Sequence, residues 1–309
     1  MSTRVAAFDC GTNSLRVLVA DLDAETLQER EVLREMRIVR LGEGVDRTGR
    51  ISDPAMQRVL SAVDDFVAMV RDADVAAVRF CATSAARDAA NAAEFMAAVR
   101  SRVGVEPEVL DGLDEARASY AGATRSLTGA ASPRLVVDIG GGSTELILGD
   151  RDGRVLAEQS LDIGSVRLTE RHLHDDPPTP AQVAALVEDV DAMLDGCRVP
   201  VIEARTVVGV AGTVTTVAAG VLGLTKYDRD AIHHAVLGVD DVVATGRELV
   251  AMPVAARREL GYLHPGRADV IAGGALILER VLRRTTPTTL LVSEHDILDG
   301  IAWSLVTPH

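Results

Sequence analysis

Two similar segments, 129 positions apart, constrain the fold of this chain more than any other feature of its sequence. Each segment begins with an aspartate after an apolar run and continues through glycine into a second apolar run: Asp9–Asp21 and Asp138–Asp150. The identical pairs are Asp9/Asp138, Gly11/Gly140, Ser14/Ser143 and Asp21/Asp150. Because each segment opens a β-β-β-α-β-α succession, we expect two similar α/β domains that face each other across a cleft.

The length of the chain and a loop near its middle indicate where these domains divide. A chain of 309 residues favours two domains. The loop Thr128–Pro133 separates the two successions, so we predict an N-terminal domain over 1–127 and a C-terminal domain over 128–309. The last predicted helix, Ile297–Leu305, could instead pack back on the first domain. Three antiparallel strands are expected before residue 42.

Charge and composition exclude several classes of protein. A net charge of −14 argues against a general nucleic-acid-binding surface. The sequence has no apolar run of about 18 residues, so no membrane span is expected. No apolar signal segment follows Met1, which favours the cytoplasm. The only lysine, Lys226, does not lie in a P-loop pattern, which argues against Walker-type nucleotide hydrolysis.

The second of the two segments carries the strongest chemical signal. The consecutive glycines Gly140–Gly142 leave backbone N–H groups uncovered and can wrap closely around an anion. The flanking carboxylates of Asp138 and Glu145 are oxygen ligands of the kind that Mg²⁺ prefers. These acidic groups would repel a phosphate unless a cation were present, so we expect Mg²⁺ (or Mn²⁺) there. Asp9, the counterpart of Asp138, is the third candidate metal ligand.

Phosphate contacts are expected from both turns and from one strand-to-helix junction. The candidates on the turns are Gly11, Thr12, Asn13, Ser14, Gly140, Gly141, Gly142 and Ser143. Gly212 and Thr213 end a strand and begin a helix, where backbone N–H groups can bind another phosphate. The side chains of Asn13 and Ser14 could equally cap their own hairpin.

Seven segments, in the same order along the chain, resemble the exopolyphosphatase/guanosine pentaphosphate phosphatase (Ppx/GppA) family. They are Asp9–Ser14, Ala82–Arg87, Gly112–Ala116, Asp138–Glu145, Gly209–Thr213, His264–Ile271 and Val292–Glu294. The resemblance covers nearly the whole chain and implies the short form of the family, with two actin-like (ribonuclease H-like) α/β domains. Where the family often reads Leu-Arg-Glu-Gly, this chain has Ile297–Gly300 instead.

The resemblance also implies roles for two further residues. Glu115, in the first turn of a predicted helix, would position and deprotonate the attacking water, and the helix dipole there favours an ionised carboxylate. Arg87, between a strand and a helix, would clamp a phosphate through its guanidinium group. Hydrolysis of a phosphoanhydride needs little more than such positioning and neutralisation of charge.

Several functions remain open at this stage. The leading hypothesis is an exopolyphosphatase that releases orthophosphate from inorganic polyphosphate and prefers short chains, because the acidic protein offers no long track for a polyanion. A guanosine pentaphosphate (pppGpp) 5′-phosphohydrolase would share the same site and chemistry. An ATP-dependent small-molecule kinase and a non-enzymatic actin-like nucleotide-binding module are less favoured. A homodimer is plausible by resemblance to the family.

Overall fold

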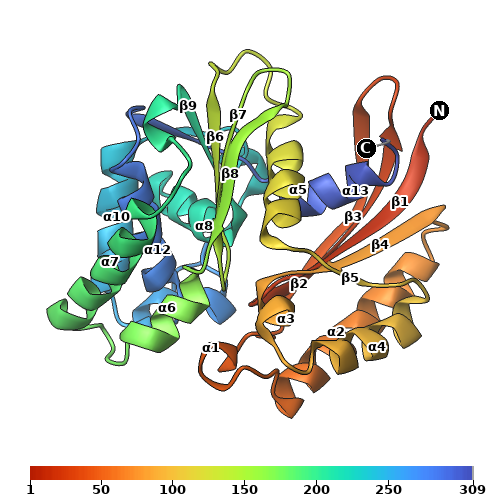
Figure 1. Cartoon of the computed structure of the whole chain (residues 1–309), viewed down its shortest axis with the longest axis horizontal. Coiled ribbons are helices and arrows are strands. Elements are labelled where there is room, and N and C mark those ends of the chain that lie inside the picture. Colours follow the sequence, from red (N-terminus) through yellow and green to blue (C-terminus); the bar gives the residue numbers. More distant parts are fainter. Residues whose placement is uncertain (308–309) are drawn as a thin grey trace. The chain divides into compact units, whose positions relative to one another are not determined.

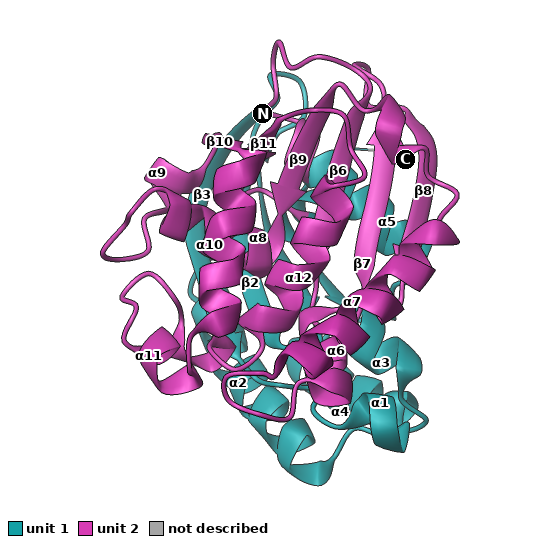
Figure 2. Cartoon of the chain, turned by 90° about the vertical axis from the view of Figure 1, so that its left-hand side faces the viewer, with its two compact units in different colours: residues 1–122, 297–309 teal, residues 123–296 magenta. Residues whose placement is uncertain are grey.

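The computed structural model describes residues 1–307, which form two compact α/β units (Figures 1 and 2). Unit 1 contains residues 1–122 and those from 297 onward, and unit 2 contains residues 123–296. The chain passes from unit 1 to unit 2 within α5 (Gly112–Thr124) and returns just before α13 (Ile297–Ser304).

The sheet of unit 1 has the strand order β3-β2-β1-β4-β5. Its strands are β1 (Thr3–Cys10), β2 (Ser14–Asp23), β3 (Gln28–Ile38), β4 (Ala77–Ala82) and β5 (Glu108–Val109). The first three strands are antiparallel, as predicted, while β4 runs parallel to β1 and β5 runs parallel to β4. The carboxyl ends of β1, β4 and β5 therefore lie at one edge of the sheet.

Alternate residues of β1 face two different hydrophobic cores, because side chains of a strand point to opposite faces of its sheet. Phe8 packs in a core with α2 (Asp53–Arg71) and α4 (Ala92–Val103), whereas Ala7 packs in a second core with Trp303 of α13. Figure 1 shows α2 and α4 on one side of this sheet and α13 on the other. The remaining helices of unit 1 are the short α1 (Val45–Thr48) and α3 (Ser84–Asp88).

The sheet of unit 2 repeats this plan and adds one strand at the edge, in the order β10-β11-β9-β6-β7-β8. Its strands are β6 (Arg134–Ile139), β7 (Thr144–Gly149), β8 (Val155–Leu161), β9 (Thr206–Val210), β10 (Val236–Gly238) and β11 (Thr289–Val292). Strands β6, β7 and β8 are antiparallel, while β9 is parallel to β6 and β11 to β9. The strand order β8-β7-β6-β9-β11 of unit 2 corresponds to the order β3-β2-β1-β4-β5 of unit 1, which confirms the predicted internal repeat.

Helices cover the sheet of unit 2 and share its single large core. They are α6 (Ser165–His172), α7 (Pro180–Asp195), α8 (Ala211–Val221), α9 (Arg229–Ile232), α10 (Val239–Ala251), α11 (Val254–Arg258) and α12 (Ile271–Leu282). Pro265–Arg267 forms a separate 3₁₀ turn, and α12 begins at Ile271. No helix among residues 1–307 is long and apolar enough to cross a membrane.

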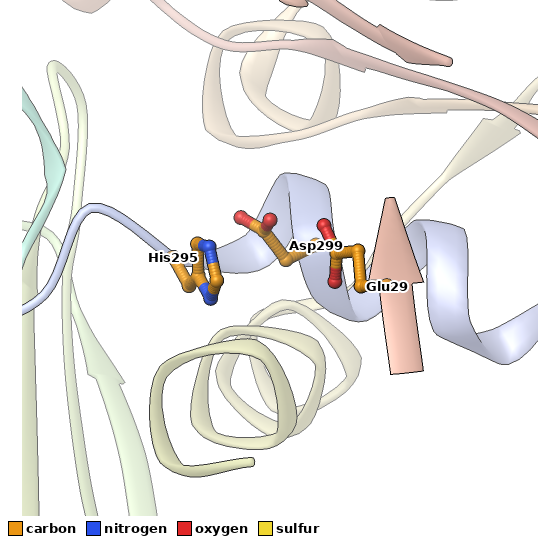
Figure 3. A group of neighbouring side chains, drawn as sticks. All are labelled: Glu29, His295 and Asp299. Atoms are coloured by element: carbon orange, nitrogen blue, oxygen red, sulfur yellow. The ribbon is translucent and has the colours of Figure 1, made fainter. Parts of the chain in front are cut away.

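A buried ion pair fixes α13 within unit 1. The guanidinium of Arg34 on β3 binds both carboxylate oxygens of Asp299, whose side chain is only 1% exposed. Burial alone lowers the pKa of Arg34, but the charges and hydrogen bonds of Asp299 and Glu31 together outweigh it and raise that pKa overall. Glu29, shown with Asp299 in Figure 3, accepts a hydrogen bond of 2.9 Å from Trp303 Nε1.

Replacing Asp299 by Asn should destabilise unit 1 by about 3 kcal/mol, because Arg34 would keep its buried charge without its main partner. Urea unfolding followed by the fluorescence of Trp303, the only tryptophan, measures this unit specifically. The matched control is Glu43→Gln, which removes the exposed 2.6 Å pair with Arg58 and should cost less than about 1 kcal/mol. Equal losses in both variants would contradict the role assigned to the buried pair.

Candidate active site

The turn between β1 and β2 is closed by backbone hydrogen bonds. The N–H of Gly11 donates to the carbonyl of Ser14 at 2.9 Å. The carbonyls of Thr12 and Asn13 accept hydrogen bonds of 2.8–2.9 Å from N–H groups in the segment 39–42. Thr12 Oγ1 is buried and has no hydrogen-bond partner within residues 1–307, which is a feature of sites where a ligand completes the hydrogen bonding.

Asp9, just before this turn, forms an ion pair within its own hairpin. It lies directly opposite Arg16 in the antiparallel pair β1–β2. Two nitrogens of the Arg16 guanidinium, Nη2 and Nε, donate to Asp9 Oδ2 at 2.6 and 2.9 Å. The negative charge of Asp9 is therefore offset by a residue of the same hairpin.

Arg87 and Glu115 come together at the same edge of the sheet of unit 1. Arg87 follows β4 on α3, and its Nη1 donates to Glu115 Oε2 at 2.9 Å and to the carbonyl of Leu110 at 3.0 Å. Asp111 caps the start of α5 by accepting from the N–H groups of residues 113 and 114, which lowers the pKa of Asp111. This cap fixes the helical turn that carries Glu115, which is 8% exposed.

Two carboxylates lie directly opposite each other in unit 2. Asp138 on β6 pairs with Glu145 on β7 in the antiparallel register, and both residues are buried, at 6% and 1% exposure. Directly opposite side chains share one face of the sheet, with their Cβ atoms about 5 Å apart, and like charges there are destabilising. Ser160 lies opposite Glu145 on β8 and donates to Glu145 Oε1 at 2.7 Å. This oxygen-only donor set fits a hard divalent cation.

The glycine turn that separates these two carboxylates packs closely against the start of α6. Gly140 N–H donates to the carbonyl of Ser143 at 3.0 Å, as in the turn of unit 1. A Cβ at Gly164 would lie 2.4 Å from the carbonyl carbon and oxygen of Gly141, so only glycine fits at position 164. The turn is thus held from the side of its carbonyl oxygens.

The junction of β9 and α8 presents a third group of backbone donors at the same edge of the sheet of unit 2. Ala211, Gly212 and Thr213 open α8, and Ala211 has a positive φ of 66°. The guanidinium of Arg267 packs directly over Gly212, because a Cβ there would lie 2.3 Å from Arg267 Cζ. A cationic group therefore lies beside the N–H groups that we predicted to bind phosphate.

A partly buried carboxylate follows β11 at this edge. Glu294 accepts hydrogen bonds from the hydroxyl of Tyr227 at 2.5 Å and from Arg229 Nε at 3.3 Å. Burial raises the pKa of Glu294, and these two partners oppose the shift only in part. Glu294 was not among our predicted site residues.

The structure gathers the predicted residues into one group in each unit. In unit 1 they are Asp9, Gly11, Thr12, Asn13, Ser14, Arg87 and Glu115; in unit 2 they are Asp138, Gly140, Gly141, Gly142, Ser143, Glu145, Gly212 and Thr213. The sequence analysis missed three arginines that contact these groups. Arg16 binds Asp9, Arg167 donates to the carbonyl of Gly142, and Arg267 packs over Gly212. Arg16 had a usable signal, because it lies 129 positions before Glu145, the same spacing that relates Asp9 to Asp138.

Comparisons with known proteins agree with the resemblance noted above. The model of the Ppx/GppA phosphatase family matches residues 18–309. The chain is 45% identical to exopolyphosphatase 2 of Mycobacterium tuberculosis over 98% of both chains. It is 29% identical to a guanosine-5′-triphosphate,3′-diphosphate pyrophosphatase of Aeromonas salmonicida, over 97% of this chain and 59% of that one. A crystal structure of an exopolyphosphatase-like protein superimposes with a TM-score of 0.94, at 41% identity and 98% coverage of both chains.

The two equivalent aspartates should respond differently to a divalent cation. In unsubstituted protein, MgCl₂ at a hundred times its dissociation constant should stabilise the fold by about 2.7 kcal/mol. Asp138→Asn should lose most of this gain, because it removes one proposed ligand. Asp9→Asn should keep the gain but lose about 2 kcal/mol at any Mg²⁺ concentration, because it removes the ion pair with Arg16.

Scanning calorimetry of the three proteins, with MgCl₂ and with EDTA, measures both effects. A full Mg²⁺ response in Asp138→Asn would exclude Asp138 as a ligand. A lost response in Asp9→Asn would instead support the sequence-based assignment of Asp9 to the metal.

Proposed function

Because the chain belongs to the Ppx/GppA phosphatase family, we propose that it is a metal-dependent exopolyphosphatase that releases terminal orthophosphate from inorganic polyphosphate. The observation that carries this proposal is the pairing of Asp138 with Glu145 on either side of a glycine turn. The carbonyl oxygens of this turn accept hydrogen bonds from the start of α6. A buried pair of carboxylates next to such a turn suits a phosphate chain bound together with a divalent cation.

Asp138 and Glu145 would hold the cation, Mg²⁺ or Mn²⁺, which would supply positive charge to the phosphate oxygens. Ser160 would orient Glu145 through the hydrogen bond at its Oε1. The N–H groups of the turns and of Gly212 and Thr213 would bind the remaining phosphate oxygens.

Glu115 would orient and deprotonate the water that attacks the terminal phosphorus. A base must be ionised to act, and the adjacent guanidinium of Arg87, at 2.9 Å, favours the ionised carboxylate. The same guanidinium would attract the terminal phosphate, so base and anion contact lie together in unit 1. The bond from the terminal phosphorus to the bridging oxygen would break, and the shortened polyphosphate would leave as a stable anion.

The second candidate function is a guanosine pentaphosphate 5′-phosphohydrolase. The similarity to a guanosine-5′-triphosphate,3′-diphosphate pyrophosphatase supports it, and its substrate presents the same kind of terminal phosphoanhydride. The kinase and the non-enzymatic module are less well supported, because a water-activating carboxylate such as Glu115 serves neither.

We further propose the cytoplasm as the site of action and a homodimer as the oligomeric state.

Replacing Glu115 by Gln should lower kcat by roughly 10²-fold or more, because the neutral amide cannot accept the proton of the water. The neighbouring Asp114→Asn is the control: its side chain is 58% exposed, and its turnover should stay within about twofold of the unsubstituted protein. Release of orthophosphate measures turnover, and circular dichroism checks the fold. Near-normal turnover of Glu115→Gln would remove this residue from the proposed role.

Chain length and substrate type should separate the two candidate functions. We expect kcat/KM to be highest for short polyphosphate and lower for both long polyphosphate and guanosine pentaphosphate. The net charge of −14 disfavours extended contact with a long polyanion. Phosphate release from the three substrates at equal terminal-phosphate concentration, with and without EDTA, measures this. Activity that rises steadily with chain length, or that survives EDTA, would contradict the proposal.

A further inference from the structure

The glycine turn of unit 2 can bind an anion only if its carbonyl oxygens are held on the opposite side. Each trans peptide unit directs its N–H and its C=O in opposite directions, so fixing the carbonyl also fixes the following N–H. All three glycine carbonyls of the turn accept hydrogen bonds from the segment 165–167 at the start of α6.

The first two carbonyls are held mainly by the backbone. Gly140 O accepts from the N–H of Ser165 at 2.9 Å and from its hydroxyl at 3.2 Å. Gly141 O accepts from the N–H groups of Val166 and Arg167 at 2.9 and 3.1 Å. These contacts place the turn against the helix without the help of a charged side chain.

The third carbonyl is held by a side chain. Arg167 Nε donates to Gly142 O at 2.6 Å, and the Arg167 side chain is only 11% exposed. Asp162 Oδ1 lies 4.0 Å from Arg167 Nη2, so that contact is weak. The carbonyl of Gly142 belongs to the same peptide unit as the N–H of Ser143. A charged donor on that carbonyl polarises this N–H and makes it a stronger donor to an anion.

The equivalent turn of unit 1 lacks this device. Within residues 1–307, the carbonyls of Thr12 and Asn13 accept hydrogen bonds only from backbone N–H groups of the segment 39–42. The guanidinium beneath the turn therefore belongs to the unit that also carries the opposed carboxylates Asp138 and Glu145.

We propose that Arg167 is a positioning residue of the phosphate-binding turn: by holding Gly142 O, it directs the N–H of Ser143 toward a bound phosphate. This inference deepens the proposed function and rests on it for the identity of the anion. Arg167 acts through the peptide of Gly142 and Ser143 and does not touch the substrate.

The test compares three substitutions on α6 by calorimetric titration with inorganic orthophosphate at saturating MgCl₂. Arg167→Met should weaken phosphate binding about tenfold, because a charge-assisted donor is lost, and Arg167→Lys should lie between it and the unsubstituted protein. The control, Arg171→Met, removes the 2.9 Å pair with Asp189 one helical turn away and should bind phosphate within about twofold of normal. Stabilisation by MgCl₂ should be unchanged in all three variants.

The outcomes separate this inference from the proposed function. Equal phosphate binding by Arg167→Met and Arg171→Met would overturn the role of Arg167, and so would an absence of phosphate binding to the unsubstituted protein. A parallel loss of phosphate binding and of Mg²⁺ stabilisation in Arg167→Met would indicate a general structural role and would also overturn it. Phosphate binding that depends on Arg167, in a protein that hydrolyses no polyphosphate, would uphold the inference and refute the proposed function.

Discussion

The repulsion between two carboxylates that face each other across β6 and β7 governs the chemistry proposed for this protein. Asp138 and Glu145 are opposed in register and buried, an arrangement that is unfavourable unless positive charge lies close by. The equivalent positions of unit 1 hold Asp9 and Arg16, which neutralise each other. The residue at one register position, Arg16 in unit 1 and Glu145 in unit 2, therefore distinguishes a hairpin whose aspartate is neutralised by an arginine from one that favours a cation.

The glycine turn adds the second requirement of a phosphate site, which is a set of donors with a fixed direction. Glycine at 140–142 permits the tight turn, and glycine at 164 lets the start of α6 approach the turn closely. The hydrogen bonds from residues 165–167 then satisfy the carbonyls, which leaves the opposite side of each peptide to a ligand. The proposed cation ligands lie on two adjacent strands, and the helix α6 fixes the direction of the donors in the turn between them. All three elements contribute to the core of unit 2.

The sequence predicted the repeat and the two turns, because both depend on short-range patterns of apolar residues, glycine and aspartate. The resemblance to the family assigned roles to Glu115 and Arg87, and the structure adds that the two residues form an ion pair. The pairing of Asp9 with Arg16 was accessible by extending the alignment of the repeat to position 16. The bond from Arg167 to Gly142 joins residues 25 apart through the packing of a helix on a turn. No local pattern encodes such packing, so these contacts could not be predicted from spacing alone.

Because the two hairpins differ, the stability of unit 1 and that of unit 2 should depend differently on a bound cation. Unit 1 neutralises its buried charges internally, through Asp9 with Arg16 and through Arg34 with Asp299, so its fold needs no ligand to balance them. Unit 2 keeps an opposed acidic pair at its hairpin, and a cation bound there would lower the free energy of the folded unit directly. Metal binding and the stability of unit 2 should therefore be thermodynamically linked.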